Sequence, residues 1–539
     1  MLAAFASLAL ASTPMLGEQA QYDTLTNVLS KHALPQHRAQ DRMAAGANST
    51  DYSTLGFFFA NCREEPSREI APVGTAPPAW LGDHSHLRLL PGHFPEGMTF
   101  HFDGLAVLAQ FNFTAAGKMV FTMKALQSGA YENYKECIYF ASGTGPTLGI
   151  KPCITNPAVN LLPINEQLWL TIDTAKWARM DPGTLDTLPD PVDLNSMVLN
   201  AHPACDRATN ECFVQYPCAA SLNGTGVFGD QVCFATLETQ ENGAGITTTV
   251  RANATIPKDK IIQHSHSPCV TGGFVVSKLD SFTPRLESDK EAGGVLKLMR
   301  QDMDNLWLVM DRASNETRVL SSVDASGAPF PFINNHFANC FEDGGDIVVD
   351  TVPVTGDYLD TYFTDQLAKP TNWSKIFLQP QRCRVPTQGN GAITCKPMLS
   401  GVPDTFVWDY PTFNPNAKML PAGKGFSALY AIAPLSPASK WFDSIIKIDA
   451  QTGAVAKTWS AEGIFVTEAD VVPRPGASAD DDGLLLTVLY NASGLGESSL
   501  AVFNADDLSL VCQYPLGQVL PFHAHGIVCP PGRACYSNP

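Results

Sequence analysis

Histidine is the residue type in this 539-residue sequence whose spacing best suits metal chemistry. Three pairs occur as H-x-H, namely His84/His86, His264/His266 and His523/His525. On a β-strand, side chains two residues apart point to the same face, so a pair of this kind can chelate one metal ion. Ordinary polar residues can share the same spacing, and a single isolated pair favours that simpler interpretation. The sequence around each histidine therefore decides which of them are candidate ligands.

Four histidines stand in longer strings. These are Ala201-His202-Pro203, His266-Ser267-Pro268-Cys269-Val270-Thr271-Gly272-Gly273-Phe274, His336-Phe337-Ala338-Asn339-Cys340-Phe341-Glu342 and Phe522-His523-Ala524-His525-Gly526. Two further strings accompany them, Phe102-Asp103-Gly104 and Glu468-Ala469-Asp470-Val471-Val472-Pro473-Arg474-Pro475-Gly476-Ala477. In order and spacing, from about Leu90 to Val528, the six strings resemble those of the carotenoid cleavage oxygenase family. That family includes the retinal pigment epithelium isomerohydrolase and the stilbene-cleaving oxygenases.

The resemblance implies a fold and a cofactor. The family fold is all-β, a seven-bladed β-propeller with helices and loops capping one face. Iron lies near the propeller axis, where the resemblance places the four matched histidines, His202, His266, His336 and His525. Four neutral imidazoles suit Fe(II), and they leave coordination positions open for O2. No electron-donating cofactor is implied, because the electron-rich polyene itself supplies the electrons for cleavage into two carbonyl products.

Carboxylates should stand behind the imidazoles, because ligating histidines need partners that fix their tautomer and ring orientation. In the family, three glutamates accept the Nδ1–H of three of the four histidines. The resemblance pairs Asp173 with His266, Asp409 with His336, and Glu468 with His525. Two of these acids are shorter than glutamate by one methylene. Either the backbone moves inward, or a water bridges, or the iron is held less firmly; otherwise Asp173 and Asp409 are solvated turn residues.

The implied activity is that of a non-haem Fe(II)-dependent dioxygenase, which cleaves a carbon–carbon double bond of a carotenoid or apocarotenoid with O2. Stilbene-cleaving members carry a lysine just before the first acid, where this chain has Ile172. This favours an apolar polyene over a hydroxystilbene. The apolar segment Leu148–Ile164 is a candidate tunnel cap that touches a membrane or lipid carrier. Three alternatives stay open: an iron-dependent isomerase, a stilbenoid-cleaving oxygenase, and a catalytically inactive secreted binding propeller.

The remaining histidines near these strings have simpler explanations. The resemblance requires neither His264 nor His523. Either they line the substrate entrance or they form hydrogen bonds at the surface, and the second interpretation is favoured. His101, beside Phe102, is expected to be structural.

The chain that must position these residues is mostly β. Apolar runs enter polar turns and return, which predicts hairpins closed by Asp, Asn and Gly. The predicted hairpins are Leu168–Leu188 with its turn at Asp181-Pro182-Gly183, Leu306–Leu320, Ile445–Trp459 and Leu500–Tyr514. Helical signals are few, and the better candidates are Tyr22–Lys31 and Tyr358–Leu367. Irregular hairpins along a chain without a boundary favour a propeller or a large barrel.

Composition limits the partners and the domain plan. Hydrophobic residues are 45% and charged residues 16%, which is typical of a folded protein. The net charge of −18, without a Lys/Arg run, disfavours nucleic acid, whose phosphates an acidic surface repels. No stretch reaches the roughly 20 apolar residues that span a bilayer. Residues 1–12 are predicted as a signal peptide, 13–54 as an N-terminal extension and 55–539 as a single propeller domain. The oligomeric state is left open.

Two features favour a secreted or secretory-lumen protein. Seven N-x-S/T sequons occur, at Asn48, Asn112, Asn223, Asn253, Asn315, Asn372 and Asn491. Fourteen cysteines include four close pairs, Cys205/Cys212, Cys218/Cys233, Cys383/Cys395 and Cys529/Cys535. Close pairs in loops suit disulfides in an oxidising compartment, although reduced buried cysteines would also explain them. No CxxC pair occurs, so a thiolate zinc site is not expected.

Overall fold

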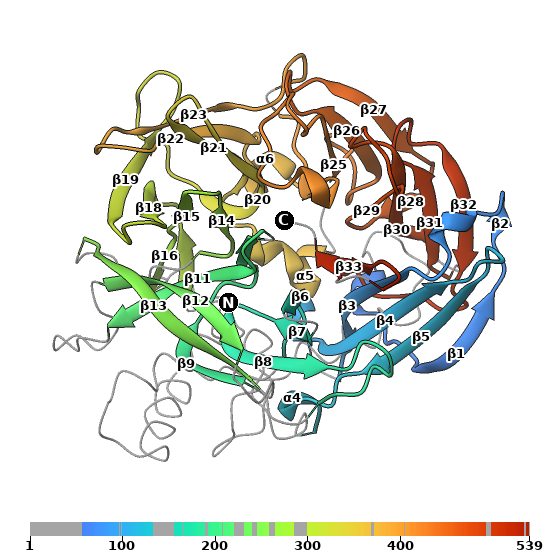
Figure 1. Cartoon of the computed structure of the whole chain (residues 1–539). Helices are drawn as coiled ribbons and strands as arrows, with labels where there is room; N and C mark the ends of the chain where they lie inside the picture. Colours follow the sequence, from blue (N-terminus) through green and yellow to red (C-terminus); the bar gives the residue numbers. More distant parts are fainter. Residues whose placement is uncertain are drawn as a thin grey trace.

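The computed structural model of the chain shows sheets arranged radially around one axis (Figure 1). It describes residues 56–537, except for 96–97, 99, 133–155, 165–166, 189–191, 207, 220–230, 240–244, 258–264, 285–298, 368–370, 404, 492–496 and 533–534. The predicted signal peptide, the N-terminal extension and the helix at Tyr22–Lys31 lie outside these residues, as does most of Leu148–Ile164. Strands dominate the described part of the chain, so the prediction of an all-β fold is confirmed.

Antiparallel strands form the first three blades of the ring. The first blade contains β1 (Glu65–Ile70), β5 (Met119–Ala125), β4 (Leu105–Phe113), β3 (Ser85–His93), β33 (Gly526–Cys529) and β34 (Tyr536–Ser537). The second contains β6 (Asn160–Ile164), β7 (Gln167–Thr171), β8 (Thr174–Met180) and β9 (Val192–Val198). The third contains β10 (Ala204–Asp206), β11 (Glu211–Ala219), β12 (Gln231–Thr239) and β13 (Ile246–Thr255).

The next two blades share one eight-stranded sheet. The fourth contains β14 (Pro268–Val270), β15 (Phe274–Lys278), β18 (Leu306–Asp311) and β19 (Thr317–Val323). The fifth contains β20 (Ile333–Asp343), β21 (Asp346–Val354), β22 (Gln381–Pro386) and β23 (Ile393–Pro397). Only a short parallel pairing, of Ser322 with Ile393 and Val323 with Thr394, joins β19 to β23. We therefore treat the two antiparallel meanders as separate blades.

Two blades complete the ring. The sixth contains β24 (Asp409–Thr412), β25 (Ala428–Ala433), β26 (Ser444–Asp449) and β27 (Val455–Ser460). The seventh contains β28 (Ile464–Val466), β29 (Asp470–Pro473), β30 (Gly483–Asn491), β31 (Ser499–Asn504), β32 (Leu510–Pro515) and β2 (Val73–Gly74). The described strands thus give the seven blades that the resemblance implied, with an additional hairpin of β16 (Ser281–Pro284) and β17 (Met299–Asp302).

The helical elements of the described residues are all short. They are η2 (Gly56–Phe59), η3 (Ala79–Leu81), η4 (His101–Asp103), α4 (Gly129–Glu132), η7 (Leu359–Tyr362), α5 (Thr364–Leu367), α6 (Trp373–Ile376) and η8 (Pro415–Ala417). The helix predicted over Tyr358–Leu367 is therefore two separate turns, η7 and α5. No helix within the described ranges is both long and apolar enough to cross a membrane.

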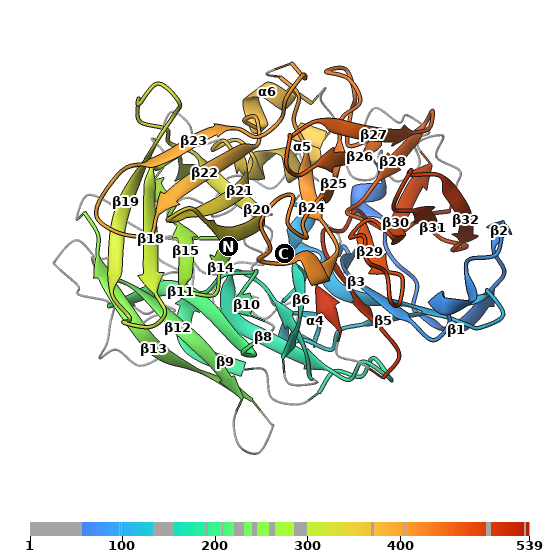
Figure 2. The same cartoon turned by 45° about the horizontal axis from the view of Figure 1, so that its top comes forward.

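The ring closes by pairing the two ends of the described chain. Arg88 of β3 pairs with Gly526 of β33, and Val73 of β2 pairs with Gln513 of β32. Both the first and the seventh blade therefore combine early and late strands. The tilted view shows β14, β20 and β29 nearer the axis than the outer strands β13, β19 and β27 (Figure 2). Residues at the inner strands of different blades consequently meet near the axis.

Three of the four predicted hairpins are confirmed, as β18–β19, β26–β27 and β31–β32. Their turns show the expected chemistry: Oδ1 of Asp449 accepts the N–H groups of Gln451 and Thr452 at 3.0 and 2.7 Å. Gly453 in this turn has φ of 71°, and a Cβ there would lie 1.9 Å from the carbonyl oxygen of Met398. Glycine is therefore required at this position.

The prediction of a hairpin over Leu168–Leu188 was wrong about the position of the turn. The chain does turn after Asp181, whose Oδ1 accepts the N–H groups of Gly183 and Thr184. However, β7 and β8 reverse earlier, between Thr171 and Thr174. The two-residue reversal contains one turn-type residue, Asp173, but neither Gly nor Pro, and the stronger turn signal at Asp181-Pro182-Gly183 placed the predicted turn too late. This error matters because Asp173 lies in that reversal.

Disulfides join three of the four predicted cysteine pairs, Cys205–Cys212, Cys383–Cys395 and Cys529–Cys535. Cys233 is also disulfide-bonded, but the side chain of its predicted partner, Cys218, lies outside the described residues. A further bond, Cys269–Cys340, was not predicted because its cysteines are 71 residues apart. It links β14 to β20. Within the described residues, Cys62 and Cys512 are free and buried.

Candidate metal centre

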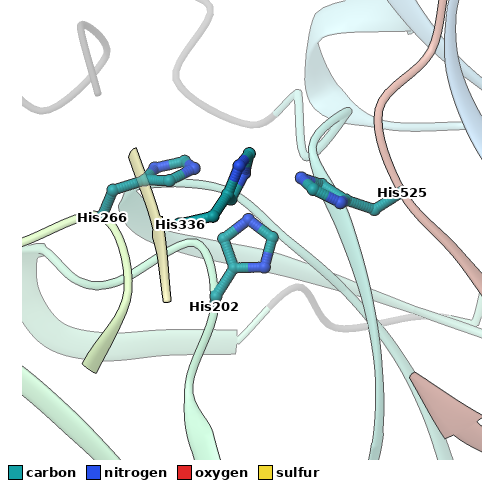
Figure 3. A group of neighbouring side chains, drawn as sticks. All are labelled: His202, His266, His336 and His525. Atoms are coloured by element: carbon teal, nitrogen blue, oxygen red, sulfur yellow. The ribbon is translucent and has the colours of Figure 1, made fainter. Parts of the chain in front are cut away.

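The four histidines predicted as ligands lie together. One nitrogen from each of His202, His266, His336 and His525 lies within 4.8 Å of the others. Their rings approach one another from four separate segments (Figure 3). The ring centroid of His202 is 4.3 Å from that of His525 and 4.8 Å from that of His266. The predicted convergence is therefore confirmed for all four residues.

The blades explain this convergence. His202 and His266 each lie two residues before a first strand, β10 and β14 respectively, and His525 immediately precedes β33. His336 lies within β20. Since these strands border the axis in different blades, segments far apart in the sequence present one imidazole each to the same small volume.

The three predicted carboxylates complete the arrangement. Asp173 Oδ1 is 3.0 Å from Nδ1 of His266, and Asp409 Oδ1 is 2.7 Å from Nδ1 of His336. The two carboxylate oxygens of Glu468 are 3.2 and 3.3 Å from Nδ1 of His525. All three acids are buried. The structure therefore places every acid beside the histidine with which the resemblance paired it, and neither aspartate is a solvated turn residue.

Asp409 reaches His336 directly because the backbone around it is irregular. The next residue, Tyr410, has a left-handed backbone with φ of 54°, and the β24–β25 register shifts between Asp409 and Thr412. A non-glycine residue in this conformation costs roughly 1–3 kcal/mol, so its surroundings must hold it. A shift of the backbone is one of the three possibilities that the sequence left open for a shortened acid, and the backbone is irregular beside Asp409.

Further donors hold the Asp409 carboxylate. Besides His336, its Oδ1 accepts the backbone N–H of Tyr410 at 2.7 Å, and its Oδ2 accepts from Nδ2 of Asn335 at 2.8 Å and from the Tyr358 hydroxyl at 3.4 Å. The Tyr358 hydroxyl also lies 3.0 Å from that of Tyr362. We did not predict Asn335 or Tyr358. Asn335 adjoins a matched histidine, but no spacing in the sequence indicates a contact with Asp409.

Asp173 gains its position from the early reversal of the chain. It lies between β7 and β8, and its carbonyl oxygen accepts the N–H of Leu199 at 3.1 Å. Leu199 immediately follows β9, three residues before His202. The early reversal between β7 and β8 is thus the feature that directs the Asp173 side chain to His266.

Burial keeps the imidazoles of His202 and His525 in the neutral form that binds metals. Burial lowers the pKa of His202 well below its usual value, and repulsion from His266 and His336 acts in the same direction. Burial also lowers the pKa of His525 well below its usual value, with further lowering by His202 and His336. Neutral imidazole carries the free lone pair that a metal needs.

These residues fit a metal ion. The carboxylates occupy the Nδ1 atoms of three histidines, which leaves Nε2 as the donor toward the shared volume. Among the described residues, the buried Nε2 atoms of His202 and His336 have no hydrogen-bond partner. Buried polar atoms are normally satisfied, so two such orphans facing a cluster indicate a missing partner. A cation bound by all four imidazoles would supply it.

The other histidines differ in their outcome. His264 lies outside the described residues. His101 is buried, with Nδ1 2.8 Å from the carbonyl oxygen of Phe58, as expected for a structural residue. His523 was predicted to lie at the surface, and this was wrong: it is fully buried, with Nδ1 3.0 Å from the Tyr490 hydroxyl. Closure of the ring by β33 carries this segment into the interior.

The sequence and the fold of this chain are similar to those of known proteins. Residues 59–529 match the family described as retinal pigment epithelial membrane protein. The chain is 24% identical over 460 residues to the apocarotenoid-15,15'-oxygenase of Synechocystis sp., covering 79% of this chain and 85% of that protein. It is 23% identical over 534 residues to the beta,beta-carotene 15,15'-dioxygenase of Rattus norvegicus, covering 88% and 91%. A cobalt-substituted ACO from Synechocystis shares the fold, with a TM-score of 0.68 at 19% identity over 89% of this chain and 99% of that one.

Proposed function

Because this chain belongs to the retinal pigment epithelial membrane protein family, the carotenoid cleavage oxygenases, we propose that it is a non-haem Fe(II)-dependent dioxygenase. Its proposed substrate is a carotenoid or apocarotenoid, which O2 cleaves at one carbon–carbon double bond. The observation that carries the proposal is the buried centre of four imidazoles. The relatives named as an apocarotenoid oxygenase and a β-carotene dioxygenase support the substrate class.

The donor set supports iron as the cofactor. Imidazole donors suit Fe(II) as well as zinc, copper and nickel, so the donor set admits iron, and membership of a family that contains dioxygenases selects it. When bound, Fe(II) supplies the redox chemistry and open coordination positions that activation of O2 requires. His202, His266, His336 and His525 would hold it.

Residues around the four histidines fix the tautomer and orientation of the imidazoles. Asp173, Asp409 and Glu468 keep a proton on the Nδ1 atoms, so that Nε2 points to the centre. The ring of Tyr410 lies 5.3 Å from that of His336 and 5.8 Å from that of His525, which covers part of the centre with an aromatic surface. Burial of these groups excludes bulk water, which favours an apolar substrate.

Cleavage of a double bond by O2 balances without an external reductant. The C=C bond breaks, the O–O bond breaks, and each former alkene carbon gains one oxygen atom as a carbonyl. The alkene carbons are oxidised and O2 is reduced by the same number of electrons. No proton is consumed or released, so the chain needs to orient the reactants rather than to supply a general acid or base.

Isotope labelling tests the activity. The purified iron-loaded chain is incubated under 18O2 with β-carotene, an apocarotenal or resveratrol, and the carbonyl products are reduced at once to alcohols to prevent exchange with water. We expect two fragments, each with one 18O atom, from a carotenoid or apocarotenoid and none from His336→Ala. One rearranged product without label would show isomerisation, and cleavage of resveratrol alone would show a stilbenoid enzyme. No turnover by iron-loaded protein would favour the binding propeller.

We further propose that the chain is a secreted or secretory-lumen glycoprotein. The disulfides support an oxidising compartment, and four described sequon asparagines, Asn253, Asn315, Asn372 and Asn491, are exposed. Expression of the full chain in a eukaryotic secretory host should yield protein in the medium whose mass falls on treatment with an N-glycosidase. Retention of all protein inside the cells, with no mass change, would contradict this location.

A further inference from the structure

A charged network lies behind one of the four histidines, and the proposed function does not use it. Arg88, on β3, is fully buried, and its Nη1 donates to Oδ2 of Asp470 at 2.5 Å. His86, two residues earlier on the same strand, is fully buried as well, with Nε2 2.7 Å from the same oxygen. Burial alone would raise the pKa of Asp470, yet Arg88 and His86 lower it overall, so the aspartate is charged.

Arg88 joins both halves of the His525–Glu468 pair. On the histidine side, its Nη2 donates to the carbonyl oxygen of Ala524 at 2.9 Å, one residue before His525. On the carboxylate side, its Nη1 lies 3.8 Å from Oε2 of Glu468, and Asp470 is two residues along the chain from Glu468. The histidine and its acid belong to different blades, and Arg88 bridges them.

The backbone around Arg88 strengthens this bridge. Arg88 pairs with Gly526, and the next N–H of β3, from Leu89, donates to the carbonyl oxygen of His525 at 3.3 Å. A Cβ at Gly526 would lie 2.5 Å from Cδ of Arg88 and 2.7 Å from Oδ2 of Asp470. Only glycine leaves room for the guanidinium at this seam, where β3 and β33 lie beside β29 (Figure 1).

We propose that Arg88, held by Asp470 and His86, is a positioning residue that fixes His525 and Glu468 relative to each other across the closing seam of the propeller. The planar guanidinium contacts Asp470 and the Ala524 carbonyl oxygen through two different nitrogens. A lysine ammonium has a single nitrogen and cannot reach both positions in this way. Its positive charge also lies between the buried carboxylates of Glu468 and Asp470, which would otherwise repel each other. The inference rests on the proposed metal centre.

The test needs a control variant that loses an arginine bridge between blades elsewhere, and the side chain of Arg382, which is 24% exposed, forms one. Arg382 on β22 is suitable, because it also forks onto one aspartate, Asp350, at 2.6 and 2.8 Å and onto a carbonyl oxygen of the next blade, that of Ala450. Arg382→Met therefore removes a comparable bridge between blades. Arg88→Lys keeps the charge and much of the volume, and it provides a folded variant if Arg88→Met does not fold.

The experiment measures metal binding rather than catalytic turnover. Full-length wild type, Arg88→Met, Arg88→Lys and Arg382→Met are loaded with Co²⁺, and chelator competition gives the metal affinity while visible absorption reports ligand geometry. Partners that orient metal-binding histidines typically affect affinity 10–100-fold, and we expect about a 10-fold loss and shifted cobalt bands in Arg88→Met. Arg88→Lys should show the same band shift with a smaller loss. Arg382→Met should keep wild-type bands and affinity.

The outcomes separate this inference from the proposed function. Wild-type bands and affinity in Arg88→Met, or in Arg88→Lys if the methionine variant is unfolded, would overturn the positioning role alone. Equal changes in Arg88→Met and Arg382→Met would also overturn it, since they would indicate a general loss of stability. Failure of wild type to bind cobalt at all would overturn the metal centre, and this inference with it.

Discussion

Asp409 differs from the glutamate of the family pattern, and yet it contacts the histidine with which that pattern pairs it. The carboxylate is one methylene shorter than the glutamate of the family, yet it lies 2.7 Å from Nδ1 of His336. Tyr410 adopts a left-handed backbone, and Asn335 and Tyr358 hold the second oxygen. The position of the acid is thus set jointly by the backbone and by three neighbours, rather than by side-chain length.

Removal of this acid should weaken the metal centre. We expect Asp409→Ala to lower iron affinity by about 10–100-fold, because His336 then loses the partner that fixes its tautomer and ring. Iron retained during competition with a chelator measures the effect. Asp357→Ala, at an exposed aspartate near Tyr358, is the control and should keep wild-type affinity. Wild-type retention in Asp409→Ala would show that the acid is not needed.

Restoration of the family residue should not improve the site. Asp409 is fully buried with its oxygens occupied, so Asp409→Glu adds a methylene to a filled space. We expect the free energy of unfolding to fall by about 1–3 kcal/mol, as for other overpacked sites. Urea unfolding measures this. Greater stability together with tighter iron binding would show that the aspartate is a defect, not a matched adjustment.

The sequence predicted which carboxylate lies beside which histidine, but it did not predict the other side chains that hold these carboxylates. The matched strings identified all four histidines of the cluster because family motifs preserve local order. Asn335, Tyr358 and Arg88 could not be found in this way, since their roles depend on contacts between segments that are far apart in the sequence. The surface location predicted for His523 failed for the same reason, because ring closure buries a segment whose local sequence gives no sign of it.

Elements place these residues, and one disulfide ties two of the elements together. Cys269 of β14 lies three residues after His266, and Cys340 of β20 lies four residues after His336. The bond therefore connects the strands that follow or carry two of the four candidate ligands. Proximity in sequence predicted the short-range disulfides, whereas this one required knowledge of which blades are neighbours.

Loss of this long-range disulfide should be more costly than loss of a short one. For Cys269→Ala/Cys340→Ala, which opens a 71-residue separation, chain entropy predicts a loss of about 4 kcal/mol in the free energy of unfolding. The matched pair Cys529→Ala/Cys535→Ala, with a separation of 6 residues, should lose about 2 kcal/mol. Urea unfolding under oxidising conditions compares them. An equal or smaller loss for the long-range pair would contradict the ranking.

The sequence predicted the turn positions of three hairpins, but it did not predict that of the β7–β8 hairpin. Turns opened by Asp311 and Asp449 carry side chains that accept the following N–H groups, so their residue types predict the reversal. The reversal at Ile172 and Asp173 is set instead by pairing of β7 with β8. Asp173 alone is a weaker turn signal than Asp181-Pro182-Gly183, so the sequence favoured the later turn.

The whole molecule depends on closure of the ring. Early and late strands pair in two blades, β2 with β32 and β3 with β33. The pairing of β3 with β33, at Arg88 and Gly526, lies directly beside the candidate metal centre. The number of blades was predictable only through the family resemblance, because irregular hairpins are too divergent to count. Closure itself was not predictable from local patterns, because β3 and β33 are far apart in sequence.

A methyl group at the seam should disturb closure. In Gly526→Ala the new Cβ would lie 2.5 Å from Cδ of Arg88 and 2.8 Å from the carbonyl oxygen of Leu87. We expect a loss of about 1–3 kcal/mol in the free energy of unfolding. Gly391→Ala, where the nearest atom is Cγ of Pro386 at 3.7 Å, should be near neutral. Equal stability of the two variants in urea would contradict a tightly packed seam.

Iron content tests the central claim most directly. Full-length protein, expressed with iron and zinc both available, is purified and analysed by elemental mass spectrometry beside His202→Ala, His336→Ala and His93→Ala. His93 is a histidine outside the cluster, so its variant is the control. The account predicts about one iron per chain in wild type and His93→Ala, and little iron in the other two variants. Stoichiometric zinc without iron in wild type, or full iron in His336→Ala, would contradict it.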